Sequence, residues 1–182
     1  KALKGLEIGC LAFVDVAAAT ALHGVAAQTP SPKQLKAGGK KLVNHYVDVI
    51  EKYIESIKSV TRYLAVDGYF MKKEFINPLL KQGLHIITKA RSDANLMYLF
   101  KGKQKSGRGR RKLYDGKIDI RKIDKRRLPC CYSDDHVRVY AGAVYCVLLK
   151  QVALAAFVYY GHKEKPEIII CTDVGIEVMT MC

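Results

Sequence analysis

The sequence lacks the motifs of several common site types. It contains neither a G-x-x-x-x-G-K-[ST] loop nor a G-x-G-x-x-G turn, so it gives no support for nucleotide binding through such loops. None of its six cysteines forms a C-x-x-C pair, and the adjacent Cys130 and Cys131 are poorly placed to ligate one tetrahedral metal together. It also lacks a secretory signal peptide and any uninterrupted apolar run of about 18 residues. These absences predict a cytoplasmic protein with reduced, mostly buried thiols and no membrane span.

Acidic residues are scarce relative to basic ones. The 182-residue chain has 31 Lys and Arg against 17 Asp and Glu, which gives a formal net charge of +14. Such an excess favours a polyanionic partner, either nucleic acid or an anionic membrane surface, although some soluble domains are simply basic. Apolar residues make up 49% of the chain and charged residues 26%, a balance that predicts a folded domain with a sizeable core.

Most of the positive charge lies in residues 101–127, which we call the basic arm. The arm holds 13 Lys or Arg and only three Asp, a net charge of +10. Its glycines allow the neighbouring cations to lie close along a phosphate backbone and to bind it through counterion release, with little sequence readout. A solvated flexible linker is the alternative interpretation. The residues expected to contact DNA are Lys105, Arg108, Arg110, Arg111 and Lys112.

Hydrophobic periodicity predicts a mixed α/β fold. Two strands joined by a short turn are expected first, then a loop and an amphipathic helix. A strand, a second helix and another strand follow as a βαβ unit, and the remainder is β-rich. The expected ranges are strands 6–16 and 19–29, loop 30–39, helix 40–59, strand 63–67, helix 70–82, strand 84–89, and strand-like runs 137–149, 152–160 and 167–172.

Asp67 is the main candidate for chemistry. In RYLAVDGYF it ends a short apolar strand, and Gly68 follows it, which allows a sharp turn and the close approach of a ligand. Catalytic groups gather at the carboxyl ends of strands in open α/β sheets, and a carboxylate there is costly unless it is paired or binds a metal. The alternative is an N-cap for the following helix, a position that Asp favours.

Other acidic residues have simpler interpretations. Asp15 also ends an apolar run, but a place at the entrance of the hairpin turn accounts for it. Asp134, Asp135 and His136 could form a metal cluster, although a loop before a strand is the favoured interpretation. The five histidines are scattered, and none lies in a recognisable nucleophile motif.

Four segments, taken in order, resemble the DDE transposases of bacterial insertion sequences. The resemblance covers at least residues 4–119. It implies an RNase H-like core in which three carboxylates hold two divalent metals, usually Mg²⁺, for DNA strand cleavage and strand transfer. The segments are KGLEIGCLAFVDV (4–16), YLAVDGYFMKKEFI (63–76), GLHIITKARSDANLMYLF (83–100) and GRGRRKLYDGKID (107–119).

The resemblance gives roles to two residues. It makes Asp67 the second catalytic aspartate and a metal ligand, and Arg91 a basic position that contacts DNA or structures the site. The first catalytic Asp is expected upstream of residue 1. The final Glu is expected beyond residue 182, because Glu177 lacks the Tyr and Arg context of the family's motif.

The predicted fold is therefore an incomplete RNase H-like mixed sheet without its first core strand, with a β-rich insertion subdomain. The expected domains are a partial core at 1–100, the basic arm at 101–127 and the insertion at 128–182. The expected function is that of a central transposase fragment that binds transposon-end and target DNA, with a homodimer left open for the full-length protein. Alone, such a chain should be inactive and marginally folded, because two sheet edges are open. The alternatives are a non-catalytic basic nucleic-acid-binding protein and a metal-dependent nuclease of the same fold.

Overall fold

A computed structural model describes residues 7–91, 94–104, 107, 109–161, 163 and 165–182. The chain divides into two compact units, Lys1–Ser59 and Val60–Cys182. The divisions expected after residues 100 and 127 both fall inside the second unit. The predicted mixed α/β class is confirmed, with a mixed sheet and a minority of helix.

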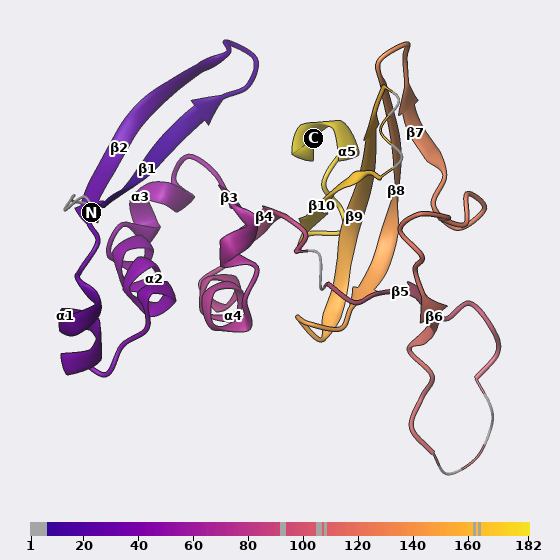
Figure 1. The fold of residues 1–182 in the computed structure, drawn as a ribbon, viewed down its shortest axis with the longest axis horizontal. Helices are drawn as coiled ribbons and strands as arrows, with labels where there is room; N and C mark the ends of the chain where they lie inside the picture. Colours follow the sequence, from indigo (N-terminus) through magenta and orange to yellow (C-terminus); the bar gives the residue numbers. More distant parts are fainter. Residues whose placement is uncertain (1–6, 92–93, 105–106, 108, 162, 164) are drawn as a thin grey trace, which may run out of the picture. The chain divides into compact units, whose positions relative to one another are not determined.

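The first unit begins with an antiparallel hairpin (Figure 1), as the alternating apolar pattern predicts. Ile8 pairs with Gln28 at its open end and Asp15 with Thr20 at the turn. The Asp15 carboxylate accepts a hydrogen bond from the Ala18 amide at 3.0 Å, which confirms its interpretation as a turn residue. The elements of this unit are β1 (Ile8–Asp15), β2 (Thr20–Gln28), α1 (Pro32–Ala37), α2 (Leu42–Lys52) and α3 (Ile54–Lys58).

Two helix predictions in this unit were wrong in detail. The segment expected to be a loop contains α1, which a capping box starts: the Gln34 amide donates to Ser31 Oγ, and the Ser31 amide donates to Gln34 Oε1. The helix expected over 40–59 is broken at Tyr53, whose φ of −117° leaves the α-helical region. Within the described part of the chain, no helix has the length and apolar character needed to cross a bilayer.

The second unit carries the predicted βαβ unit and most of the strands. β3 and β4 run parallel, with Tyr63 opposite His85 and Val66 opposite Thr88, and α4 lies between them in sequence. The elements are β3 (Tyr63–Val66), the 3₁₀ turn η1 (Gly68–Phe70), α4 (Lys73–Lys81), β4 (His85–Lys89), β5 (Leu96–Leu99), β6 (Tyr114–Lys117), β7 (Cys130–Ser133), β8 (Val137–Cys146), β9 (Gln151–Tyr160), β10 (Glu167–Cys171) and α5 (Val178–Met181).

One continuous sheet joins the βαβ unit to the β-rich half. The strand order is β3-β4-β10-β9-β8-β5-β6, and β7 pairs with β8 beside this path. β10 is antiparallel to both β4 and β9, so it connects the two parts. The predicted strands at 137–149, 152–160 and 167–172 are confirmed as β8, β9 and β10. β5, β6 and β7 were not predicted.

The core of this unit lies on both faces of the sheet. Phe75, Ile76 and Leu79 of α4 are at most 1% exposed and bury one side of the helix. Alternate residues of β8 and β9, such as Val139 and Val158, pack with residues from the chain end. Alternation along a strand leaves the other residues of β8 and β9 facing the opposite side of the sheet.

Candidate functional site

Asp67 lies directly after β3, at the carboxyl end of the parallel β3–β4 pair. Its side chain is exposed, and its Oδ1 accepts a hydrogen bond from the Gly68 amide at 2.6 Å. The Thr88 hydroxyl of β4 donates to the Asp67 backbone carbonyl at 3.1 Å, which fixes the strand end. Within the described chain, the second carboxylate oxygen has no hydrogen-bond or ion-pair partner.

The alternative interpretation of Asp67, an N-cap of the following helix, holds for a 3₁₀ turn and not for α4. The residue is the N-cap of η1, a single 3₁₀ turn, whereas α4 begins later, after Lys72. Capping uses one oxygen, so the geometry is compatible with both a cap and a ligand. Gly68 has a structural reason of its own, because a Cβ there would lie 3.0 Å from the Lys89 carbonyl oxygen.

Arg91 follows β4 at the same end of the sheet as Asp67. The parallel register places Val66 level with Thr88, so the residues just beyond these strands are neighbours at one edge. Arg91 is exposed, and its amide donates to the Met71 sulfur at 3.4 Å. The two residues that the resemblance selects therefore follow neighbouring parallel strands at the same edge of the sheet.

A two-metal centre does not fit the described residues by themselves. Mg²⁺ needs several hard oxygen ligands, of which carboxylates are the usual protein source. The described residues include no group of three or more His, Cys, Asp or Glu side chains placed to hold a metal ion. Asp67 would supply one ligand to such a centre.

The first part of the basic arm, up to Leu113, forms a long loop between β5 and β6 (Figure 1). The Gln104 side chain closes the loop: its Nε2 donates to the Lys112 carbonyl at 2.7 Å, and its Oε1 accepts from the Lys112 amide at 3.1 Å. Arg110 and Arg111 are exposed and make no ion pair with a described carboxylate. Lys105 and Arg108 lie outside the described residues.

Asp115 of β6 organises the base of this loop. Its carboxylate pairs with Arg127 at 2.6 Å and with Lys112 at 3.2 Å, and these contacts, Arg127 first, lower the pKa of Asp115. The Lys112 ammonium also lies 4.8 Å from the centre of the Phe100 ring. Lys112 is therefore partly committed to the loop base, whereas Arg110 and Arg111 are available.

The structure does not bring the loop to the Asp67 end of the sheet. Five strand-to-strand steps separate β4 from β6 in the sheet, which is roughly 24 Å at the usual spacing. The predicted site residues thus form two groups, Asp67 with Arg91 and the loop cations.

A polar cluster at the opposite end of β3 has no signature in the sequence. The Tyr63 hydroxyl donates to Asp173 Oδ2 at 2.7 Å, and the Gly175 amide donates to Oδ1 at 2.8 Å. The hydrogen bonds from the Gly175 amide and, second, from the Tyr63 hydroxyl lower the pKa of Asp173. The hydrogen bond between Tyr63 and Asp173 also raises the pKa of the Tyr63 hydroxyl. Thr172 lies 3.4 Å from His85 Nδ1 and accepts a hydrogen bond from the Ile86 amide. The cluster fastens the turn after β10 to β3 and β4.

Asp134 closes the turn between β7 and β8. It accepts hydrogen bonds from the Tyr132 hydroxyl and from the His136 and Val137 amides at 2.6–2.7 Å, which lowers its pKa. The loop interpretation of Asp134-Asp135-His136 is confirmed.

All six cysteines are free, as predicted. The expectation of mostly buried thiols was wrong, because only Cys146 and Cys171 are buried. Burial raises the pKa of both thiols.

Comparisons with models of protein families, with curated proteins and with solved structures gave no match.

Proposed function

We propose that this chain is a central piece of a DDE transposase that contributes one metal-binding carboxylate, Asp67, and a DNA-binding surface. The observation that carries the proposal is the place of Asp67, an exposed carboxylate directly after the first strand of a parallel βαβ unit. Ligands and catalytic groups collect at this edge of α/β sheets. Arg91 at the same edge would neutralise charge on a bound phosphate.

The strand pairing supports an RNase H-like arrangement. Such a sheet has the strand order 3-2-1-4-5, in which β2 and β1 correspond to strands 3 and 2, and β3 and β4 to strands 4 and 5. Among the described strands, β1 pairs only with β2, and β3 pairs only with β4. β1 and β3 therefore each have one edge without a neighbour among the described strands, as the proposal requires of a sheet whose first strand is missing.

The isolated chain should bind DNA without cleaving it. Two metal ions need more carboxylates than Asp67, and the described residues do not provide them. We therefore expect no Mg²⁺-dependent nicking of plasmid DNA by the purified 182-residue chain. Nicking that depends on both Mg²⁺ and Asp67 would contradict this view.

The coding DNA on either side of this segment tests the transposase proposal directly. The expected result is an upstream frame that encodes an apolar strand ending in Asp, and a downstream frame that encodes a helix with Tyr, Arg and Glu. If both flanks lack these features, the transposase proposal fails and a non-catalytic nucleic-acid-binding protein takes its place. The described residues favour that second function in one respect, since their exposed loop cations need no metal to bind DNA.

DNA binding by the loop has its own test, which both functions share. We expect the affinity for a 20-base-pair duplex to fall steeply with salt. The double variant Arg110→Gln/Arg111→Gln should lower the log–log salt slope by about 2, because each phosphate contact contributes about 0.9. Asp67→Ala should leave both quantities unchanged. An unchanged slope in the double variant would remove the loop from the DNA-binding surface.

A further inference from the structure

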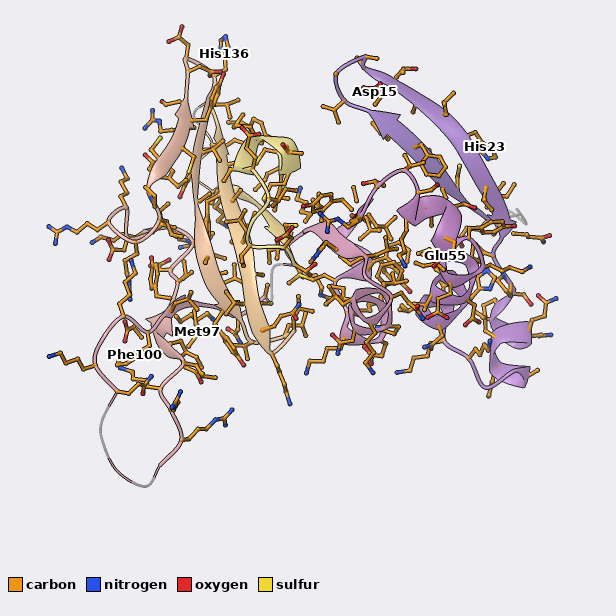
Figure 2. All side chains as sticks on the ribbon, turned by 180° about the vertical axis from the view of Figure 1, so that it is seen from behind. Asp15, His23, Glu55, Met97, Phe100 and His136 are labelled. Atoms are coloured by element: carbon orange, nitrogen blue, oxygen red, sulfur yellow. The ribbon has the colours of Figure 1, made fainter. Side chains whose placement is uncertain are left out.

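A cavity of about 380 Å³ lies in the second unit, away from both groups of predicted site residues. Its walls come from the second half of the basic arm, the β7–β8 turn and the paired ends of β8 and β9. Figure 2 shows His136, which lines the cavity, at one end of these strands, and Phe100, at the base of the loop, at the other. The four cationic residues that line the cavity are Arg121, Lys125, Arg138 and Lys163.

Buried apolar residues hold the cations from the basic arm in place. Ile118, Ile123 and Leu128 are at most 8% exposed, so the chain from 118 to 128 packs against the sheet although it is strongly basic. Arg121 and Lys125 flank Ile123 and line the cavity with it. Their position therefore follows from core packing and not from a free, solvated linker.

One face of β8 and β9 supplies the other wall. Arg138 and Tyr140 are two residues apart on β8 and so share a face, and Tyr159 of β9 pairs directly with Arg138. The Tyr140 and Tyr159 rings meet edge to face, 5.8 Å apart, and the Lys125 ammonium lies 5.4 Å from the centre of the Tyr140 ring. Within the described chain, neither tyrosine hydroxyl has a hydrogen-bond partner.

The two carboxylates at the cavity, Asp134 and Asp135, offset only part of the charge of its four cations. Asp134 is already held by three donors of the β7–β8 turn, and Asp135 has no partner among the described residues. The Lys163 ammonium forms an ion pair with Glu167 at 3.9 Å. Arg121, Lys125 and Arg138 make no ion pair with any described carboxylate. Three cations without an ion pair therefore line one space together with two tyrosines, and the four cations outnumber the two carboxylates there.

We propose that this cavity binds a phosphate group, and that the phosphate belongs to a DNA backbone. Arginine presents a planar fork of donors that suits phosphate oxygens, and a lysine ammonium and a tyrosine hydroxyl add further donors. The cavity is large enough for more than a single ion, as expected for a phosphate that is part of a chain. The part of this inference that names DNA as the source of the phosphate rests on the proposed function, whereas the phosphate site itself does not.

The test uses the full chain with two charge-matched double variants. Arg121→Gln/Arg138→Gln removes two cavity cations. Lys122→Gln/Arg126→Gln removes two cations of the same segment that are exposed but do not line the cavity. All four side chains are exposed, so each variant should keep the wild-type amide spectrum, which is checked first.

Two measurements are made on each protein. The first is the affinity for the 20-base-pair duplex over a salt series. Here the cavity variant should lose about tenfold, with a slope lower by about 2, and the control variant should lose much less. The second is an amide NMR titration with inorganic phosphate and with thymidine monophosphate. The amides of Val137, Arg138 and Gly161 should shift in the wild type and in the control, and not in the cavity variant.

The outcomes separate the two proposals. If phosphate shifts these amide signals but the cavity variant binds DNA as the wild type does, the phosphate site is supported and its ligand is a free phosphate ester. This result would overturn the proposal that the phosphate belongs to DNA. No shift with phosphate, nucleotide or duplex, or equal shifts in both variants, would overturn the site. Loss of DNA binding only in Arg110→Gln/Arg111→Gln would leave the proposed function standing while the cavity proposal fails.

Discussion

Replacing Arg127 should destabilise the protein, although the residue belongs to a segment that composition marks as a solvated basic arm. The guanidinium donates to the Leu99 carbonyl at 2.8 Å and to Asp115 at 2.6 Å. It also lies 4.9 Å from the centre of the Tyr98 ring, and its side chain is only 21% exposed. Arg127 thus connects the end of the basic arm to β5 and β6.

The magnitude follows from two of these contacts. A hydrogen bond from a charged donor to a carbonyl contributes about 1–2 kcal/mol, because its removal leaves the carbonyl without this partner. The contact with the Tyr98 ring adds about 0.5–1 kcal/mol. We assign no share to the ion pair with Asp115, since pairs near the surface contribute little. Arg127→Ala should therefore cost about 2 kcal/mol of unfolding free energy.

The neighbouring residue provides the control. Arg126 is exposed and takes part in the local turn through its backbone, because its amide donates to Asp124 Oδ1 at 3.0 Å. Arg126→Ala removes the same charge and should change the stability by less than about 0.5 kcal/mol.

Urea unfolding followed through the amide signals of β8 reports on the second unit alone. For Arg127→Ala the midpoint should fall by about 1 M, given a typical urea dependence of about 2 kcal/mol per M. Equal urea midpoints for the two variants would refute the view that Arg127 stabilises the fold while its exposed neighbour Arg126 does not.

Three further predictions concern the sheet ends. Gly68→Ala should cost about 1–3 kcal/mol, because its Cβ would press on the Lys89 carbonyl; Gly109→Ala, with nothing within 4 Å, should be neutral in the same urea assay. The lowered pKa of Asp173 gives stability that is present above its usual value of about 3.9 and is lost as the pH falls through the folded-state value. Asp173→Asn should therefore reduce the loss of stability below about pH 4 in acid-unfolding curves. Asp67→Ala should leave the amide spectrum outside η1 unchanged; a global change would mean that its cap is essential to the fold.

Strong local patterns made part of the fold predictable. The strands of the βαβ unit and strands β8, β9 and β10 come from apolar runs whose length and period differ clearly from those of a helix. Asp67 was placed at a strand end because a single charged residue followed by glycine interrupts such a run. These features depend on neighbours in sequence, so the sequence carries them.

Other elements depended on signals that were weaker or absent. The capping box of Ser31 and Gln34 is visible in the sequence, and it predicts a helix start between the prolines and glycines, where α1 begins. The break at Tyr53 has no such signal, because the apolar spacing continues across it. β6, with the sequence YDGK, has little strand propensity of its own, and its pairing with β5 defines it.

The basic arm shows why charge counting alone could not locate the binding surfaces. The prediction of a DNA-binding arm rests on its charge, with a flexible linker as the alternative, yet Ile118, Ile123 and Leu128 are at most 8% exposed, so the second half of the arm packs. Packing separates the cations into those on the open loop, those that face the cavity, and Arg127, which stabilises the sheet. A nucleic acid bound at both the loop and the cavity would follow the length of β8 and β9. The charge variants should then act additively on the salt slope, because distant contacts that share no partner contribute independently.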